Sequence, residues 1–535
     1  MKKSTRFNFV YAFFLALILI LGMILGVRFL KDQGYTIQKP NQANTNSDRR
    51  VADILSLIQN NYVDEVNSDT LQNMPIDSLL QQLDPHSVYL PAEKAYAMSD
   101  DLEGNFEGIG VEYYILNDTL FITNVVKDGP AFNVGLKVGD KILKIDTVQV
   151  SGRSLPQKDM MGRLKGKKGS QVQVVIARRG FPQAIPMLIK RGKVEVNSVD
   201  AAYMLNAETG FIRISKFGAN TEKDFVEALR GLKAKGLKKL VLDLRDNGGG
   251  YVTSATSLAN HFFEQDKLIM YTQGRNEPRT DYFTTGGGEF EQGKLAVLIN
   301  ENSASAAEII AGAIQDGDRG IIIGRRSFGK GLVQEQFQLD DGSALNLTVA
   351  RYYTPLGRSI QKSYKKGYTA YKQELEERFN DGELTQPDGK KVDSLQKGTV
   401  YTTPAGKKVF GGGGITPDVF IKLDTTGYTK LYGKLLDERI LFDYTFEILV
   451  KRYSANNLNQ SSSQFQISET DWKDFIKYAQ NKGVSANSKV FEPSKTLILS
   501  DLKLMLYRFY FGDQGYYRIA NQTDPMIKSA LSKLQ

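Results

Sequence analysis

The chain has 535 residues, 41% of them hydrophobic, with two histidines and no cysteine. This length predicts three or four domains, and the lack of cysteine excludes a thiol nucleophile and a thiolate zinc site. Only His86 and His261 could serve a histidine-based catalytic triad, and neither lies in a convincing triad context. The net charge of +9 comes from scattered basic residues without a nucleic-acid motif. We therefore expect a solvated surface and no nucleic-acid partner.

The chain begins with a long uncharged stretch. Residues 7–27 are rich in Phe, Leu and Ile and follow three basic residues, and a helix that spans a bilayer needs about 20 such residues. No Ala-x-Ala-like cleavage site follows closely, which favours a retained anchor over a removed signal peptide. We expect a transmembrane anchor over residues 1–31 and a polar linker over residues 32–47 that holds the rest of the chain off the bilayer.

Two modules of different periodicity follow the linker. Residues 48–100 have apolar positions at helical spacing and end near the stretch LDPHSVYL at residues 83–90. Residues 101–193 alternate short strands with Gly, Asp and Pro turns, which indicates a compact β-rich domain.

The β-rich domain contains the blocks FEGIGVE (residues 106–112) and GPAFNVGLKVGDKIL (residues 129–143). These blocks resemble a PDZ domain. In that fold the backbone amides of Gly108, Ile109 and Gly110 bind the terminal carboxylate of a peptide, and the peptide adds as a strand to the sheet. The resemblance implies an apolar last residue in the peptide. The alternative is that Gly-Ile-Gly is only a turn.

The region after residue 194 contains a serine and a lysine in strand-to-loop contexts. Ser305 lies in LAVLINENSASAAEIIAGAIQDG, and Lys330 lies in GIIIGRRSFGKGLVQEQF. A serine becomes a nucleophile when a neighbour takes its proton, and a lysine can do so only if burial lowers its pKa below about 10.4. Apolar residues on both sides of Lys330 favour such burial, and Gln334 could accept a hydrogen bond from the amine. Taken singly, Ser305 and Glu308 match an S-x-x-E capping box, and Lys330 matches a solvated loop cation.

A glycine-rich loop comes before the serine. Residues 240–251 read LVLDLRDNGGGY, which predicts a buried strand that breaks into a loop before a helix. Glycines let backbone N–H groups approach a ligand closely, so the loop could supply one donor of an oxyanion hole, with Ala306 as the other. Alternatively the loop is a tight connection or a phosphate cradle, although no nucleotide-binding spacing is present.

The blocks in this half of the chain resemble those of the carboxyl-terminal processing peptidases, which are tail-specific serine proteases of family S41. They occur in the family's order and are FIRISKF, VLDLRDNGGG, NSASAAEIIAGAIQD, FGKGLVQ, ARYYTPLGRSIQ and GGGGITPDV. The resemblance implies that Ser305 is the nucleophile, Lys330 the general base and Gln334 the residue that orients the lysine. It implies a Clp protease- and crotonase-like core, no metal or cofactor, and a location in the bacterial inner membrane with the catalytic part in the periplasm or outside the cell.

Two departures from the family pattern lie in this region, the glycine loop and an insertion, and a tail without an assigned motif follows. The loop reads Asn-Gly-Gly-Gly where Asn-Pro-Gly-Gly or Asn-Ser-Gly-Gly is usual, which assigns the oxyanion donor to Gly249, and that assignment could shift by one residue. An insertion at about residues 363–408 interrupts the protease core expected over residues 194–425, and we expect a surface excursion. Residues 426–535 carry amphipathic, aromatic-rich patterns that predict a helical extension packed on the core or on another subunit.

The sequence thus predicts a multidomain α/β serine endopeptidase that recognises free protein C-termini through a PDZ domain. A homodimer through the terminal helices and an adaptor or lipoprotein partner are further hypotheses. The rival interpretations are a catalytically inactive PDZ scaffold, an acyl-CoA enzyme of the crotonase type, and a lipid or retinoid carrier.

Overall fold

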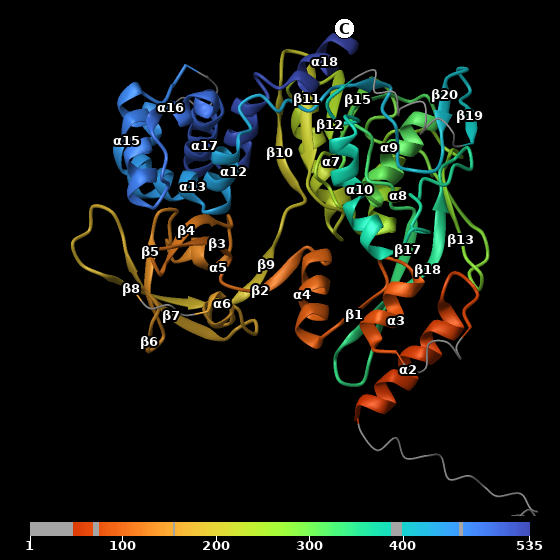
Figure 1. Ribbon diagram of the computed structural model, residues 1–535, viewed down its shortest axis with the longest axis horizontal. Helices are drawn as coiled ribbons and strands as arrows, with labels where there is room; N and C mark the ends of the chain where they lie inside the picture. Colours follow the sequence, from red (N-terminus) through yellow and green to blue (C-terminus); the bar gives the residue numbers. More distant parts are fainter. Residues whose placement is uncertain (1–45, 68–73, 153–155, 387–398, 459–463) are drawn as a thin grey trace, which may run out of the picture. The chain divides into compact units, whose positions relative to one another are not determined.

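A computed structural model describes residues 46–67, 74–152, 156–386, 399–458 and 464–535 (Figure 1). The predicted anchor and all but the last two residues of the predicted linker lie outside the described residues. None of the helices in the described ranges is long and apolar enough to cross a membrane. The chain divides into two compact units, residues 1–59 and 60–535. In the first unit the described residues form helix α2 (Asn46–Asn61), which ends just past the unit's boundary.

The second unit begins with a short helical segment that pairs with a strand from later in the chain. Its elements are α3 (Ile76–Leu83), β1 (Val88–Leu90) and α4 (Ala92–Leu102). Strand β1 pairs antiparallel with β18 (Ala344–Tyr353), with Val88 opposite Asn346. The LDPHSVYL stretch is therefore fixed beside a strand that comes more than 250 residues later.

The β-rich domain forms one antiparallel sheet of order β3-β4-β5-β7-β8, with β6 beside β5. Two helices accompany it, and a separate pair of strands, β2 and β9, closes the domain at its ends. The bounds of these elements are β2 (Asn105–Gly108), β3 (Val111–Leu116), β4 (Thr119–Val125), α5 (Pro130–Asn133), β5 (Lys141–Ile145), β6 (Val148–Gln149), α6 (Gln157–Leu164), β7 (Gln171–Ala177), β8 (Ile185–Lys190) and β9 (Gly192–Glu195). Alternate residues of β7 are buried, because only one face of this sheet covers the domain core.

The largest domain is built on a six-stranded core sheet of order β10-β11-β12-β15-β16-β21. All pairs after β10 and β11 are parallel. Its elements are β10 (Val199–Met204), β11 (Thr209–Ile214), α7 (Thr221–Lys233), β12 (Lys239–Asp243), α8 (Val252–Asn260), β15 (Lys294–Ile299), α9 (Ala306–Asp316), β16 (Ile321–Gly324) and β21 (Val419–Phe420). Helices cover both faces of this sheet, so its central strands are continuous apolar runs rather than alternating ones.

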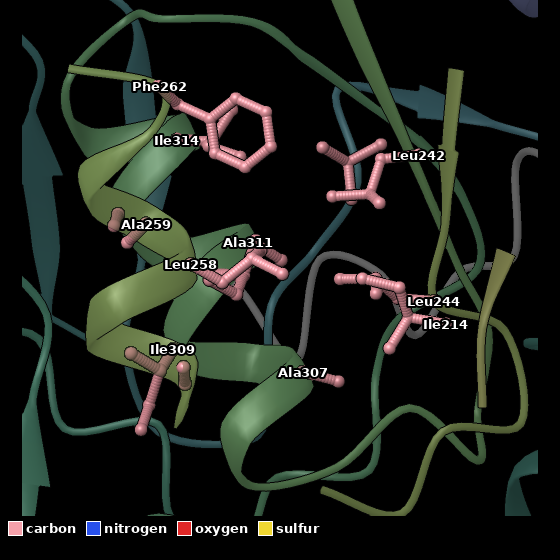
Figure 2. Close-up of a cluster of buried hydrophobic side chains, with 14 of the residues drawn as sticks. Ile214, Leu242, Leu244, Leu258, Ala259, Phe262, Ala307, Ile309, Ala311 and Ile314 are labelled. Atoms are coloured by element: carbon pink, nitrogen blue, oxygen red, sulfur yellow. The ribbon is translucent and has the colours of Figure 1, made fainter. Parts of the chain in front are cut away.

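Helices α8 and α9 pack together against one face of the core sheet. Figure 2 shows Leu258 of α8 and Ala311 of α9 directed toward Leu242 and Leu244. Leu242 belongs to β12, and Leu244 directly follows this strand. All four side chains are fully buried. Because α9 begins at the candidate nucleophile, this packing fixes the position of the active-site turn.

A second sheet has the order β1-β18-β13-β14, with β17 also paired to β18. The additional strands are β13 (Leu268–Gln273), β14 (Thr280–Phe283) and β17 (Leu332–Gln338). The insertion contributes helix α10 (Tyr368–Asn380) and the hairpin of β19 (Val400–Thr402) and β20 (Lys408–Phe410).

The C-terminal extension is helical, as the amphipathic patterns predict. Its elements are α12 (Lys430–Asp437), α13 (Ile440–Tyr444), η2 (Thr445–Leu449), α14 (Val450–Arg452), η3 (Ala455–Asn457), α15 (Glu469–Asn481), α16 (Ser488–Phe491), η4 (Glu492–Ser494), α17 (Lys495–Ala520) and α18 (Pro525–Lys533). Its aromatic core includes Tyr114, Leu116 and Phe121 of the β-rich domain. Helix α18 covers the other face of the core sheet with Met526 and Ile527. The extension therefore packs on two domains of its own chain.

Candidate active site

Three loops meet at one edge of the core sheet. They follow the adjacent parallel strands β12, β15 and β16, and carry the triple glycine, Ser305 and Lys330 respectively. Because the carboxyl ends of parallel strands lie at the same edge, the topology brings together segments that are far apart in the sequence.

Ser305 lies on a strained turn between β15 and α9. Its φ of 55° and ψ of −116° fall in a region that residues with a side chain rarely adopt. A sharp turn of this kind holds a serine hydroxyl out at the end of a strand in serine hydrolases of the α/β type. Its carbonyl accepts a hydrogen bond from the buried Tyr352 hydroxyl at 3.2 Å.

The capping box expected from the sequence is present at this turn. The Glu308 carboxylate accepts the Ser305 N–H at 2.9 Å, and the Glu308 N–H donates to the Ser305 carbonyl at 2.8 Å. The Ser305 side chain is half-buried at the loop edge.

The Glu308 side chain is the central connection of the site, whereas its local sequence predicts only a helix cap. It is fully buried. One carboxylate oxygen accepts the N–H groups of both Ser305 and Lys330 at 2.9 Å. The other accepts the Gly329 N–H at 2.7 Å and the Ser327 hydroxyl. Because both N–H groups reach the same oxygen, the backbone nitrogens of Ser305 and Lys330 lie no farther apart than the sum of these two 2.9 Å hydrogen bonds. Burial raises the Glu308 pKa to about 7, and these four hydrogen bonds oppose the rise.

Lys330 lies in an environment that disfavours its charge. Burial lowers the pKa of its ammonium below the usual 10.5, and the carboxylates of Glu308 and Asp84 partly oppose this effect. The direction is the one that a lysine base requires, because only the neutral amine can take a proton.

Gln334 begins the second part of β17, where the pairing with β18 shifts by a bulge. Its side-chain amide donates to the Thr348 hydroxyl at 3.2 Å. The Thr348 N–H donates to the Ser87 hydroxyl, which itself donates to the buried Asp84 carboxylate at 2.6 Å. This network connects Gln334 to the LDPHSVYL stretch. Asp84 is a second site residue that the sequence analysis did not single out.

The glycine loop lies directly against Ser305. A Cβ atom on Gly249 would come within 2.6 Å of Ser305 Cβ and 2.9 Å of the Ala306 nitrogen, and the Gly249 φ is 97°. The Gly249 N–H donates to the Asn247 side chain at 2.8 Å. Of the two oxyanion donors expected from the sequence, only the Ala306 N–H has no acceptor among the described residues.

The two histidines have different surroundings. His86 Nε2 lies 2.7 Å from the Tyr371 hydroxyl, and burial together with the Lys330 charge lowers the His86 pKa to about 3. It is therefore a neutral neighbour of the lysine. His261 follows α8, where its ring contacts Glu222 at 3.2 Å and accepts the Glu289 N–H.

The insertion does more than form the surface excursion that the sequence suggested. The Arg378 guanidinium of α10 donates to the carbonyls of Arg326 and Ser327, and it is 4% exposed. Glu383 accepts from both Arg326 and Arg378. This buried cluster braces the loop that leads into Lys330.

The loop of the β-rich domain that precedes β3 presents unpaired backbone donors. Ile109 and Gly110 are buried, and their N–H groups have no acceptor among the described residues. Buried N–H groups are nearly always paired in folded proteins, so these two are suited to an external acceptor. Gly108 instead belongs to β2 and lies opposite Gly192.

In the part of the chain that the structure describes, no group of three or more His, Asp or Glu side chains forms a metal site.

Three parts of the chain match known protein families. Residues 208–368 match the model of peptidase family S41, residues 108–186 match the PDZ domain, and residues 431–512 match a family of unknown function. The carboxy-terminal processing protease CtpB of Bacillus subtilis is 33% identical over 70% of this chain and 78% of its own length. The carboxy-terminal-processing protease of Bartonella bacilliformis is 36% identical over 61% of this chain and 75% of its own length. The structure of a photosystem II D1 C-terminal processing protease covers 59% of this chain and 90% of its own, with 29% identity and a TM-score of 0.36.

The fold and the site define a serine peptidase core joined to a PDZ domain. The chain belongs to the carboxy-terminal processing proteases of peptidase family S41.

Proposed function

We propose that this protease cleaves peptide bonds with a Ser305–Lys330 dyad. The neutral Lys330 amine takes the Ser305 hydroxyl proton while the oxygen attacks the substrate carbonyl carbon. The resulting ammonium then donates that proton to the leaving amine, which departs and leaves an ester on Ser305. Water attacks the ester with Lys330 again as base, and the serine recovers its proton as the new carboxylate leaves.

The contact that supports this dyad best is the Glu308 oxygen that accepts the N–H groups of both residues. It fixes the two backbones against each other across a separation of 25 residues. Gln334 is assigned the role of orienting the lysine amine, because its amide nitrogen already donates to Thr348 and its carbonyl oxygen can accept.

The oxyanion is assigned to the N–H groups of Ala306 and Gly249. The Gly249 N–H must first leave Asn247, so its contribution requires a rotation of the glycine loop. Positive φ values at Gly249 and Gly250 make such a rotation accessible to this segment. A donor lost from an oxyanion hole costs about 10²- to 10³-fold in rate.

Substrate selection is assigned to the PDZ domain. We infer that the free N–H groups of Ile109 and Gly110, with Gly108 at the entrance of the loop, bind the terminal carboxylate of a protein substrate. The substrate then adds as a strand along β3, which is at the edge of its sheet.

We further propose that residues 7–27 tether the protease to the bacterial inner membrane, with the catalytic part in the periplasm or outside the cell. Support comes from the uncharged length of this stretch alone. Resistance of the cell-bound protein to alkaline carbonate extraction, together with its digestion by protease added to spheroplasts, tests this arrangement. Release by carbonate contradicts the tether, and protection in intact spheroplasts contradicts the orientation.

The dyad is tested by cleavage of casein with the wild type and with Ser305→Ala and Lys330→Ala. Each substitution is expected to reduce the rate by on the order of 10³-fold or more. Ser363→Ala and Lys366→Ala are matched controls, because both residues are exposed. Full activity of either dyad variant would contradict the mechanism. A peptide with a free C-terminus should be cleaved faster than its amidated twin, and equal rates would contradict the PDZ assignment.

The second candidate is the PDZ scaffold without catalysis, which the hydrogen bond from the Gly249 N–H to Asn247 favours if the glycine loop never rotates. Under that reading the free-carboxylate peptide binds and casein stays intact in every variant.

A further inference from the structure

A cavity lies between the outer face of the PDZ sheet and the helical extension. Its volume is about 250 Å³. Glu112 and Thr123 line it from strands β3 and β4, and Phe442, Met505 and Phe509 line it from the extension. Neither the PDZ domain nor the extension encloses this space without the other.

The contacts that hold the two walls together are specific. The Tyr114 hydroxyl donates to Asp443 at 2.8 Å, and the Arg439 guanidinium lies 4.0 Å from the centre of the Tyr114 ring. Arg179 donates to the carbonyls of Val450 and Lys451 at 3.0 and 2.8 Å. Tyr114 and Phe121 of the PDZ sheet are part of the apolar core of the extension. The cavity therefore lies within a well-packed interface between the PDZ domain and the helical extension.

The apolar side chains set the chemistry of the cavity. Phe442, Met505 and Phe509 are only partly buried, so their surfaces are available to an occupant. Its polar neighbours are already paired, Glu112 with Asn124 at 3.0 Å and Arg508 with Asp513 at 2.6 Å. An apolar side chain can therefore enter without leaving a charge unpaired.

The position of the cavity relative to the peptide site follows from strand geometry. A substrate whose carboxylate meets the Ile109 and Gly110 N–H groups must run antiparallel to β3, because β3 leads away from that loop. Its last residue then lies beside Val111, and its penultimate residue lies beside Glu112. Side chains directly opposite each other on neighbouring strands share one face of the sheet. Val111 and Tyr113 pack on the PDZ core, whereas Glu112 faces the cavity.

We infer that this cavity is a specificity subsite of the protease that takes a large apolar side chain at the penultimate position of the substrate. The subsite rests on the proposed binding of C-termini by the PDZ domain and adds a second selected residue to it. It gives the helical extension a part in substrate choice. The side chain before the penultimate one faces the PDZ core instead, so it does not reach the cavity.

The test uses the full-length chain with Ser305→Ala, solubilised in mild detergent, and fluorescent peptides that share one apolar last residue. One peptide has Phe at the penultimate position and Ala before it, the second has these two exchanged, and the third has Ala at both. The first is expected to bind about tenfold more tightly than the third. Thr123→Trp, which fills the cavity from β4, should remove this advantage, whereas Thr123→Val, which keeps the volume, should retain it. Met505→Trp fills the same space from α17 and provides a second variant.

The outcomes separate this inference from the function on which it rests. Equal affinity for the first and third peptides, or an advantage that survives both Trp variants, overturns the subsite while the PDZ assignment stands. Failure of all three peptides to bind better than their amidated forms overturns the PDZ assignment itself. If one Trp variant also loses affinity for the peptide with Ala at both positions, its PDZ domain is damaged. The presence or loss of the Phe advantage is then measured in the other Trp variant.

Discussion

Glu308→Gln is the substitution that most sharply tests how this active site is held together. The glutamine keeps the size of the side chain but replaces one oxygen by an NH₂ group. If that group faces the Ser305 and Lys330 N–H groups, two buried donors lose their acceptor. If it faces the other way, the Ser327 hydroxyl can turn to accept, and only the Gly329 N–H is left unpaired. The second orientation costs less and should be adopted.

The magnitude follows from these contacts. One buried N–H without a partner costs about 1–3 kcal/mol, and hydrogen bonds to a neutral rather than a charged acceptor are each weaker by about 1 kcal/mol. We expect the variant to lose on the order of 3 kcal/mol of unfolding free energy and at least tenfold in kcat/KM. The loss of the negative charge also lowers the pKa of Lys330 further, because Glu308 is the first of the two groups that raise it. The rise of the variant's kcat/KM with pH should therefore shift to lower pH.

Casein cleavage across pH 6 to 10, with thermal unfolding of the same samples, provides the measurements. Glu335→Gln is the matched control, because Glu335 is an exposed carboxylate on β17. A Glu308→Gln enzyme with wild-type kcat/KM would refute the reasoning. A variant that loses stability while its pH profile stays in place would show that Glu308 supports the fold without acting on Lys330.

Three further predictions concern neighbouring features. Gly249→Ala should reduce kcat at least tenfold, because its added Cβ would lie 2.6 Å from the Ser305 Cβ. Gly248→Ala is the control and should keep nearly full activity, because no atom lies within 4 Å of its added Cβ. Equal rates of casein cleavage by the two variants would contradict the close approach of Gly249 to Ser305. The His86 pKa of about 3 lies below the usual 6.5, so the unfolded chain binds a proton in this range that the folded chain does not, and stability should fall as the pH drops from about 6.5 toward 3. His86→Gln should flatten this part of a plot of unfolding midpoint against pH, and an unchanged slope would argue against a neutral His86. Arg378→Met removes the side chain that donates to two carbonyls of the loop before Lys330. It should lower the free energy of unfolding by about 3 kcal/mol, measured by chemical denaturation, and reduce the rate of casein cleavage. Cleavage at the wild-type rate would show that α10 does not hold the loop before Lys330 in place.

Local sequence patterns were enough to indicate the family, the fold class and the candidate site residues. Continuous apolar runs ending in turns predicted the parallel strands before the glycine loop and before Ser305, and the structure has β12 and β15 there. Short alternating strands predicted the β-rich domain. These signals are local, because each depends on the periodicity of a few consecutive residues. The same local information left Glu308 as a helix cap, since S-x-x-E has that meaning in most proteins.

The contacts between these parts are visible only in the folded protein. Glu308 accepts N–H groups 21 and 22 residues away, Arg378 braces a loop about 50 residues earlier, and Tyr114 meets Asp443 across 329 positions. It also showed the Gly249 N–H bonded to Asn247, which a count of glycines does not reveal. Contacts of this kind depend on strand order and on which faces pack together. A carboxylate that only caps a helix and one that also joins the Ser305 and Lys330 loops have the same local sequence, and only the register of distant strands distinguishes them.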